Sequence, residues 1–383
     1  MPRPIRVIHF VAGLGRGGVE SWLAEVAKRI DRDRFKFDIA VHLPEKPGDY
    51  TQDVLATGSL IHRLPPPSQP LAFAPALYRL LRGASGYDIV HTHVHLFNGV
   101  VITLARLAGV PVRLAHSRGV NPPPDNASWI ARSVYPAAMR RLIDASATRR
   151  LAVSREAGAG LFGHRWQDAK DAVIVRSGID TRRFAAVDCT PPPPDDRTLT
   201  IAHIARLDWQ KNQAFVVQVM AEIARAKPQA RLLLAGADLQ GSWLEHRLRR
   251  DAPSGRIDIR PPLADTAPLF TREIDVLLLP SLHEGLPRVA LEAQAAGVPV
   301  AMSNTITPET IIIDDLVKTM PLAAGIDVWR DAVIDLAYRH REGRLTSPAS
   351  CVKIMQASEF SIDRNVESLE RLYADLVGDI TEQ

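Results

Sequence analysis

Residues 280–299, PSLHEGLPRVALEAQAAGVP, decide how the rest of the chain is interpreted. They follow residues 275–279 (DVLLL), an apolar run without alternation, which is typical of a parallel strand covered on both faces. Ligands of such sheets bind at the carboxyl ends of the strands, so Glu284 falls where binding groups are expected. Pro287 suits the first position of a helix, which we expect to end at Gly297.

The start of that helix would bring several binding groups together. Glu292 lies on the helix, eight residues after Glu284. The backbone N–H groups of Gly285 and Leu286 would point out of the positive helix end, towards a phosphate or a sugar hydroxyl. Two carboxylates beside such amides suit a sugar nucleotide, which carries both hydroxyls and negative charge. The alternative is a buried strand and helix with two solvated glutamates.

The motif E-G-L-P-x-V-x-L-E-A-Q-A-A-G-x-P-V at residues 284–300 resembles the E-x7-E signature of the retaining family 4 glycosyltransferases, especially their bacterial exopolysaccharide and surface-glycan branch. The likeness covers about the whole chain. It implies the α/β fold called GT-B, in which two Rossmann-like doubly wound domains face each other across a cleft.

The activity implied by the resemblance is that of a glycosyltransferase, class EC 2.4. Such an enzyme moves a sugar from a nucleotide-diphosphate sugar, such as a UDP- or GDP-sugar, to a hydroxyl of a glycan or lipid-linked acceptor, with retention of configuration. The implied setting is the synthesis of exopolysaccharide, lipopolysaccharide or another cell-surface glycan. Two other activities stay open: a GT-B sugar-nucleotide epimerase or hydrolase, and a non-catalytic sugar-nucleotide-binding partner.

Length and composition fit this class. A chain of 383 residues suggests two domains, and contents of 46% hydrophobic and 23% charged residues are ordinary for a globular protein. No apolar run is long enough to cross a bilayer, and the first residues indicate a strand rather than a signal peptide. The two cysteines have no metal or redox spacing, so the cytoplasm is the expected location.

Charge differs between the two halves. Residues 1–188 hold 26 Lys and Arg against 16 Asp and Glu, whereas residues 189–383 hold 21 against 27. The basic half favours an anionic partner, and we expect peripheral contact with the inner face of the cytoplasmic membrane. Nucleic acid is not expected, because the arginines are not interleaved with aromatic residues.

Alternating strands and helices predict the domain order. Residues 1–188 form an N-terminal, acceptor-side domain. Residues 189–196 (CTPPPPDD) form a linker, because prolines cannot join a helix or a sheet interior. Residues 197–360 form the nucleotide-sugar domain, and a helix at 361–383 packs back on the first domain in the family resembled. Strands are expected at 60–64, 88–92, 112–115, 198–204, 231–235 and 257–260, and helices at 74–81, 98–108, 212–226 and 243–250.

A glycine-rich stretch, GLGRGGVE, follows the first strand. Gly13, Gly15 and Gly18 fit the dinucleotide-binding pattern G-x-G-x-x-G, so a Rossmann dehydrogenase must be considered. Asp38, the candidate ribose ligand, stands at the beginning of its strand-like run and therefore at the wrong end of the sheet. The resemblance implies instead that the Gly17 and Gly18 amides approach the donor diphosphate.

Histidines cluster on the next strands. His91, His93 and His95 would share one face of a strand, so a metal site is conceivable; partly buried or cleft-lining imidazoles are the favoured alternative. The family resembled needs no metal, and we expect no cofactor. His116 corresponds to a family histidine near the transferred sugar, and the alternative is a hydrogen-bonded strand-end histidine.

Two basic residues follow the first strand of the second domain. Arg206 and Lys211, in ARLDWQKN, would flank a strand-to-helix connection and so share a small volume with a helix N-terminus. The resemblance implies that they hold the diphosphate and stabilise negative charge on the leaving group. The alternative is solvated surface charge.

The remaining site assignments are implied by the resemblance. Glu284 would bind the hexose and Glu292 the ribose, while Gly236 and Arg260 would lie near the nucleobase and ribose, largely through backbone contacts. Two carboxylates also fit a glycosidase, but the neighbouring cations argue against it, because a glycosidase has no phosphate to hold. The predicted catalytic residues are His116, Arg206, Lys211 and Glu284, and the predicted donor-binding residues are Gly17, Gly18, Arg206, Lys211, Gly236, Arg260, Glu284, Gly285, Leu286, Pro287 and Glu292.

Overall fold

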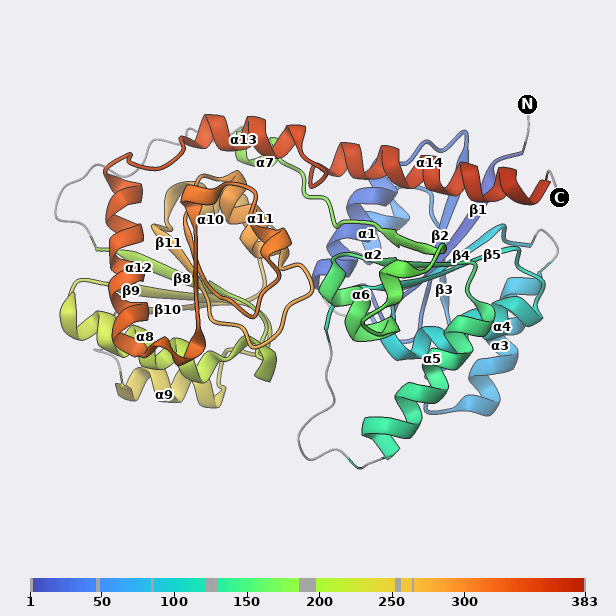
Figure 1. The fold of residues 1–383 in the computed structure, drawn as a ribbon, viewed down its shortest axis with the longest axis horizontal. Coiled ribbons are helices and arrows are strands. Elements are labelled where there is room, and N and C mark those ends of the chain that lie inside the picture. The colour runs from blue at the N-terminus through green and yellow to red at the C-terminus, as the bar shows by residue number, and fades with distance from the viewer. Residues whose placement is uncertain are drawn as a thin grey trace. The chain divides into compact units, whose positions relative to one another are not determined.

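The structure is a computed structural model that describes residues 3–45, 49–83, 86–120, 128, 130–185, 198–251, 256–263 and 265–381. The chain forms two compact units, Met1–Gly178 with Ile362–Gln383, and Ile179–Ser361 (Figure 1). Residues 179–185 group with the second unit, whereas the sequence assigned them to the first domain. The predicted linker at 189–196 lies outside the described residues.

The first unit is built on a seven-stranded parallel sheet in the order β3-β2-β1-β4-β5-β6-β7. The order reverses between β1 and β4, as in a doubly wound fold. The strands are β1 (Ile5–Phe10), β2 (Phe35–Val41), β3 (Ile61–Arg63), β4 (Ile89–Thr92), β5 (Val112–Ser117), β6 (Arg149–Ala152) and β7 (Ala172–Ile174). The helices are α1 (Gly18–Arg29), α2 (Thr51–Leu55), α3 (Pro70–Arg82), α4 (Asn98–Leu107), α5 (Tyr135–Ser146), α6 (Arg155–Phe162) and α14 (Ile362–Thr381).

The second unit is built on a six-stranded parallel sheet in the order β10-β9-β8-β11-β12-β13. Its strands are β8 (Thr200–Ile204), β9 (Arg231–Ala235), β10 (Ile257–Arg260), β11 (Val276–Leu279), β12 (Val300–Ser303) and β13 (Val317–Met320). Its helices are α7 (Arg182–Ala185), α8 (Gln213–Ala226), α9 (Trp243–Asp251), α10 (Ala267–Arg272), α11 (Arg288–Ala295), α12 (Ile326–Arg341) and α13 (Pro348–Ala357). Helices cover both faces of each sheet (Figure 1).

Apolar strands buried on both faces explain this architecture. All four residues of β11, VLLL, are buried, and Leu277 and Leu278 point to opposite faces because side chains alternate along a strand. Each fully buried leucine contributes about 1.5–3 kcal/mol relative to an exposed one. Such strands are stable only between two layers of helices, which is why the sheets are doubly wound.

The C-terminal helix α14 completes the first unit. It packs against α1, and Trp22 on α1 donates its indole N–H to Oδ1 of Asn365 on α14 at 2.6 Å. Leu369 and Tyr373 on its inner face are fully buried. The end of the chain therefore supplies core residues to the same unit as its beginning. In the described part of the chain, no helix combines the length and apolarity needed to cross a bilayer.

Candidate functional site

The candidate site of the second unit lies where its strand order reverses. Strands β8 and β11 are neighbours in the middle of the sheet and run in parallel. The connections that leave their carboxyl ends go to opposite sides of such a sheet, which opens a crevice for a ligand. The connection after β8 carries Arg206 and Lys211, and the one after β11 carries Glu284, so the topology places these three predicted residues at one edge.

Hydrogen bonds join the two connections. Asp208 accepts from the backbone N–H of Gln210 and so caps the short 3-10 turn Trp209–Lys211. Asn212 then adopts a left-handed conformation, with φ of 53°, that turns the chain into α8. Its side-chain amide donates to the Pro280 carbonyl at 3.1 Å, and the Leu282 N–H donates to the Gln210 carbonyl at 2.7 Å. The loops are therefore fixed relative to each other.

Lys211 and Glu284 form an ion pair across this junction. Ser281 donates its hydroxyl to the same Glu284 oxygen at 3.0 Å. The Lys211 side chain is 20% exposed and that of Glu284 13%, so the pair is screened by solvent far less than a surface pair. A diphosphate that reached this ammonium group would have to take it from the Glu284 carboxylate, or share it with that carboxylate.

Arg206 lies in the same loop but faces a neighbour. Its guanidinium donates two hydrogen bonds to Asp208, at 3.0 and 2.8 Å, and its side chain is 65% exposed. Gln213 anchors the loop by donating to the Arg206 carbonyl at 2.8 Å. An exposed pair of this kind contributes about 0–1 kcal/mol, so moving Arg206 onto a phosphate costs little.

Helix α11 presents its N-terminus beside Glu284. Pro287 is the N-cap residue and no side chain caps the helix there, while the Ala290 N–H donates to the Pro287 carbonyl at 3.0 Å. Leu286 is buried, and Gly297 takes a φ of 78° directly after the helix, as its predicted end requires. Glu292 accepts a hydrogen bond from the Thr266 hydroxyl at 2.8 Å.

Gly236 brings the end of β9 against the loop after β8. Its φ is 155°, and a Cβ atom there would lie 1.9 Å from the Ala205 carbonyl oxygen, so no other residue fits. Arg260 ends β10 beside it, and its guanidinium is occupied by Glu273, at 3.0 and 2.7 Å, and by Asp258. Hydrogen bonds to these carboxylates raise the Arg260 pKa. Its side chain is committed to this network, and its backbone carbonyl accepts from the Gly236 N–H at 3.2 Å.

The predicted glycines of the first unit lie at the start of α1. Gly17 is the N-cap residue of this helix, without a side-chain cap, and Gly18 is its first residue. Asp38, the ribose ligand of the dinucleotide alternative, lies within β2 and accepts hydrogen bonds from the Tyr87 hydroxyl at 3.1 Å and the Leu60 N–H at 3.0 Å. That carboxylate is used inside the unit, which argues further against a dehydrogenase.

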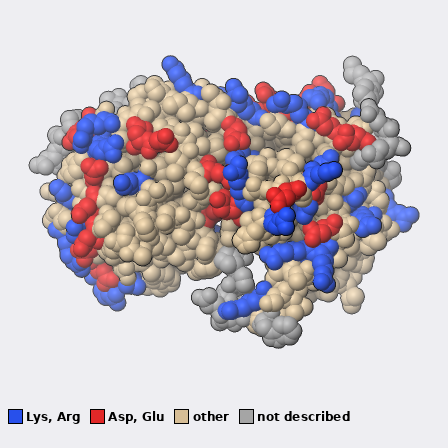
Figure 2. Space-filling model, in the orientation of Figure 1, with Lys and Arg blue, Asp and Glu red and all other residues tan. Residues whose placement is uncertain are grey.

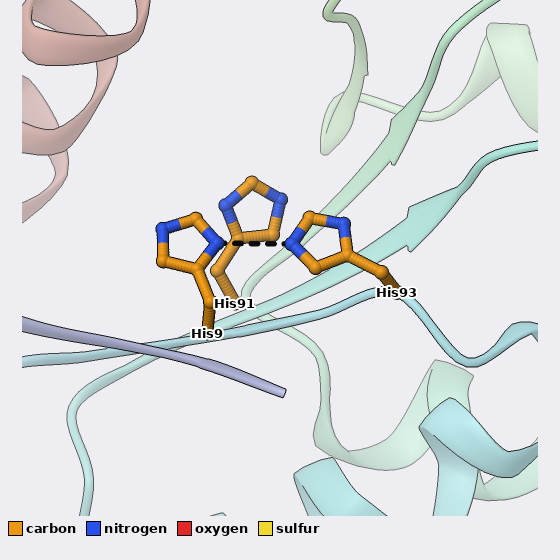
Figure 3. A group of neighbouring side chains, drawn as sticks. All are labelled: His9, His91 and His93. Atoms are coloured by element: carbon orange, nitrogen blue, oxygen red, sulfur yellow. Dashed lines mark hydrogen bonds between the residues drawn. The ribbon is translucent and has the colours of Figure 1, made fainter. Parts of the chain in front are cut away.

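The histidines of the first unit form a buried cluster, but not the predicted one. The prediction that His91, His93 and His95 share a strand face is wrong, because β4 ends at Thr92 and His95, with φ of 52°, begins a 3-10 turn. The third member is His9 on β1, whose Nδ1 lies 3.0 Å from Nε2 of His93 (Figure 3). The sequence contained one signal for His9: a histidine inside the otherwise apolar end of the strand IRVIHF.

His116 belongs to the same cluster. Its Nδ1 lies 2.9 Å from Nε2 of His91, and both rings are fully buried. Burial, together with the nearby Arg118 cation, lowers the pKa of His116 well below its ordinary value. Arg118, which the sequence analysis did not single out, stacks on Trp22 at 3.8 Å and donates to Nδ1 of His93 at 3.1 Å.

Family comparisons cover both units. The family described as "Glycosyltransferase Family 4" matches residues 16–183, and the family described as "Glycosyl transferases group 1" matches residues 198–337. The putative glycosyltransferase EpsF of Bacillus subtilis is 30% identical over 361 residues, which span 88% of this chain and 89% of that protein. A D-inositol 3-phosphate glycosyltransferase of Salinispora tropica is 26% identical over 413 residues, covering 95% of this chain and 82% of that protein.

Solved structures share the fold. The sucrose-phosphate synthase of Thermosynechococcus elongatus has a TM-score of 0.75 at 18% identity and covers 98% of this chain and 100% of that one. Anabaena HepE, in complex with UDP and glucose, has a TM-score of 0.67 at 16% identity and covers 99% and 98%. Two parallel-sheet Rossmann-like units of this kind define the GT-B class. The chain belongs to the family 4 glycosyltransferases, and it is therefore a transferase of class EC 2.4.

Proposed function

We propose that this glycosyltransferase retains anomeric configuration as it moves a sugar from a nucleotide-diphosphate sugar to a hydroxyl of a glycan or lipid-linked acceptor. The proposed setting is the synthesis of exopolysaccharide, lipopolysaccharide or another cell-surface glycan, in the cytoplasm. The similarity to EpsF supports the family assignment on which this proposal depends. HepE was solved with UDP-glucose, so a UDP-sugar is the first donor to test.

The observation that carries the proposal is the Lys211–Glu284 pair at the reversal of strand order. A cation and a carboxylate held side by side match a ligand that is anionic at one end and rich in hydroxyls at the other. Lys211 and Arg206 would neutralise the diphosphate as it leaves, and the α11 amides would add further donors. Glu284 would accept from hexose hydroxyls and Glu292 from the ribose.

Charge on the leaving group is carried by side chains and amides in this proposal, so neither a metal nor another cofactor is needed. The experiment supplies UDP- and GDP-sugars with candidate glycan acceptors and follows the products by mass spectrometry, with and without a chelator. We expect an acceptor-dependent glycoside that forms in the chelator and has the donor's anomeric configuration by NMR. Donor consumption without an acceptor would indicate an epimerase or hydrolase instead, and an inverted product would contradict retention.

We also propose peripheral contact between the basic first unit and anionic lipid. The unit, residues 1–178 with 362–383, holds 26 Lys and Arg against 20 Asp and Glu, and this surplus supports the contact. On the face drawn in Figure 2, basic and acidic side chains are interspersed, so such contact would be weak and sensitive to salt. Flotation with liposomes containing anionic lipid tests it: binding is expected at low salt and should be lost at high salt, and no binding at low salt would rule the contact out.

A further inference from the structure

A continuous line of hydrogen bonds runs through the core of the first unit and begins at Arg118. The Arg118 Nε–H group donates to Nδ1 of His93 at 3.1 Å. Nε2 of His93 in turn lies 3.0 Å from Nδ1 of His9 (Figure 3). Arg118 also donates to the Ser177 hydroxyl at 3.0 Å and stacks on Trp22, so its position is fixed on several sides.

The line continues through the C-terminal helix to His116. Nε2 of His9 lies 3.2 Å from the hydroxyl of Tyr373 on α14, and this hydroxyl lies 2.7 Å from Nδ1 of His91. Nε2 of His91 lies 2.9 Å from Nδ1 of His116. We call this set the histidine network; its members are Arg118, His93, His9, Tyr373, His91 and His116.

The directions of the hydrogen bonds can be worked out from Arg118, the first residue of the histidine network. A guanidinium only donates, so Nδ1 of His93 must accept. A neutral imidazole has one N–H and one acceptor nitrogen, so the proton of His93 is on Nε2 and is donated to His9. The same step places the proton of His9 on Nε2, where it is donated to the Tyr373 oxygen. The Tyr373 oxygen could accept from both histidines, but its own buried hydroxyl proton would then have no acceptor among the described residues. The favoured arrangement is therefore that Tyr373 donates to His91, and His91 donates from Nε2 to His116.

All four histidines must be neutral for these bonds to form. Each is fully buried, and burial is the main cause that lowers its pKa well below the ordinary value, with Arg118 adding to the effect. A second proton on His9 or His116 would set two N–H donors against each other, and one on His93 would face the Arg118 N–H. A second proton on His91 would turn the Tyr373 hydroxyl from donor to acceptor and leave its proton without a partner among the described residues. Geometry and charge therefore agree on one arrangement of protons.

The line ends at Nε2 of His116. No hydrogen bond of good geometry satisfies this nitrogen among the described residues, and a weaker interaction with the Val175 carbonyl favours a proton on the ring. A buried donor without an acceptor costs about 1–3 kcal/mol, and native structures keep few of them. A ligand oxygen that reached this position would remove that cost.

We propose that the histidine network holds the proton of His116 on Nε2, with Arg118 and Tyr373 as positioning residues. His116 would then offer only a hydrogen-bond donor at Nε2, to a ligand oxygen that displaces the groups covering this buried atom, and could not act as a base there. The identity of this oxygen, a sugar hydroxyl or phosphate oxygen, rests on the proposed function. The proton arrangement does not, because it follows from contacts within the first unit alone.

A metal ion is the competing explanation for part of the cluster. One nitrogen from each of His9, His91 and His93 lies within 4.8 Å of the others. A ligand nitrogen must offer a lone pair, but the acceptor nitrogens of all three rings already receive hydrogen bonds, from His93, Tyr373 and Arg118 respectively. The network also places a guanidinium beside these rings and contains no carboxylate to balance a dication. Hydrogen bonding therefore fits these residues better.

The test measures proton positions in the full-length wild-type protein. Histidine labelled with ¹⁵N in the ring gives long-range ¹H–¹⁵N spectra that distinguish the two neutral forms from the charged form. At about pH 7.5 we expect His9, His91, His93 and His116 to be neutral and protonated on Nε2. A proton on Nδ1 of any of the four, or a charged ring, would overturn the proposal. Stoichiometric zinc binding that shifts the signals of His9, His91 and His93 would overturn it in favour of a metal site.

Tyr373→Phe tests the link to His116. Without the hydroxyl, nothing forces His91 to accept at Nδ1, so His91 and His116 should become mixtures of both neutral forms, while His9 and His93 stay protonated on Nε2. Tyr78→Phe, which removes a hydroxyl bonded to Arg82 on the exposed part of α3, is the matched control and should change none of the four. An unchanged His116 in Tyr373→Phe would contradict the positioning role.

Measurements of turnover and donor binding distinguish a failure of the histidine network from a failure of the proposed function. With UDP-glucose, or whichever sugar nucleotide is turned over, kcat of Tyr373→Phe should fall about two- to tenfold, the range expected when one hydrogen bond loses its fixed direction. Donor affinity measured by calorimetry should stay within about twofold, because the candidate donor residues other than Gly17 and Gly18 lie in the second unit. If no sugar nucleotide binds but the proton positions are as expected, the proposed function fails and the network stands. If donor binds and the proton positions differ, the network fails alone.

Discussion

In the proposed function, Lys211 and Glu284 hold two binding groups side by side, one for the diphosphate and one for the sugar. The ammonium group and the carboxylate neutralise each other, so each avoids most of the desolvation free energy that a buried, unpaired ion would cost. A diphosphate would take the ammonium group from the carboxylate, which is then released for hydroxyls. The pair therefore links recognition of the phosphate to recognition of the sugar.

Replacing Glu284 by Gln should separate these two roles. The amide keeps the size of the side chain but removes a negative charge next to the diphosphate position, so UDP or GDP should bind at least as tightly as to the wild type. Turnover of the sugar nucleotide should fall at least tenfold, because a charge-assisted hydrogen bond to the hexose, worth about 1.5–3 kcal/mol, is lost. Calorimetry and initial rates check both parts. Weaker nucleotide binding with unchanged turnover would contradict the assignment.

For single residues, the sequence indicated positions better than it indicated hydrogen-bond partners. That Glu284 and Lys211 lie close together was predictable, because both follow apolar strands at the carboxyl edge of one sheet. The hydrogen bonds of Arg260 with Glu273 were not, since a partner 13 residues away depends on how β10 and the end of α10 pack. His9 and His93 lie 84 residues apart, and only strand pairing brings them together.

At the scale of elements, the loops after β8 and β9 act as one support for the candidate site. Hydrogen bonds from Ala205 to Ala235 and from Leu207 to Ala237 hold the first loop along the second. The contact between Gly236 and the Ala205 carbonyl requires that no side chain intervene. Arg206 follows Ala205 directly, so the shape of this support sets where its guanidinium can reach.

Gly236→Ala should therefore disturb the site as well as the fold. The added methyl group would overlap the Ala205 carbonyl, and we expect a loss of about 2–4 kcal/mol in the free energy of unfolding, as for other overpacked and strained positions. Nucleotide affinity should fall in the fraction that remains folded. Urea titration and calorimetry measure the two effects.

Gly241→Ala is the control for backbone strain alone. Gly241 also has a positive φ, 68°, but an added Cβ meets nothing within 4 Å. The substitution should lower the free energy of unfolding by about 1 kcal/mol and leave nucleotide affinity unchanged. Equal effects of the two substitutions would show that the contact with Ala205 is unimportant.

The bounds of helices and strands were more predictable than the hydrogen-bond partners of single residues. Strands β9 and β10 have the predicted bounds, because β9 (RLLLA) is a nearly continuous apolar run and β10 (IDIR) alternates apolar and charged residues. The histidine-rich stretch was misread because alternation of residue type continues past Thr92 while the strand does not. A left-handed residue such as His95 breaks the pattern for reasons of backbone geometry that residue types do not reveal.

For the whole molecule, the buried histidines predict a specific sensitivity to acid. The pKa values of His9, His91, His93 and His116 are lowered in the folded chain, while the unfolded chain has ordinary values near 6.5. Below that pH the unfolded state binds protons that the folded state does not, so stability falls as pH falls. The slope approaches about 1.4 kcal/mol per pH unit for each histidine.

Unfolding midpoints between pH 7.5 and 5.5 check this, since most carboxylates stay ionised across that range. We expect the thermal midpoint to be constant above about pH 7 and to drop steadily below 6.5. A midpoint that is independent of pH, or that rises in acid, would contradict the neutral, buried state of these rings. The slope reports mainly on the first unit. A smaller part comes from two histidines of the second unit: burial lowers the pKa of His203 to about 4 and also lowers the pKa of His340.

The central claim is that the loops at the carboxyl ends of β8 and β11 bind the nucleotide diphosphate. Calorimetric titration of UDP and GDP into the wild type and Lys211→Ala tests it. At least one nucleotide should bind the wild type, and loss of the ammonium group should weaken it at least tenfold, the loss expected for a charge-assisted contact. Lys353→Ala, which removes an exposed lysine on α13, is the control and should bind like the wild type. Equal affinity in the wild type and Lys211→Ala would contradict the account.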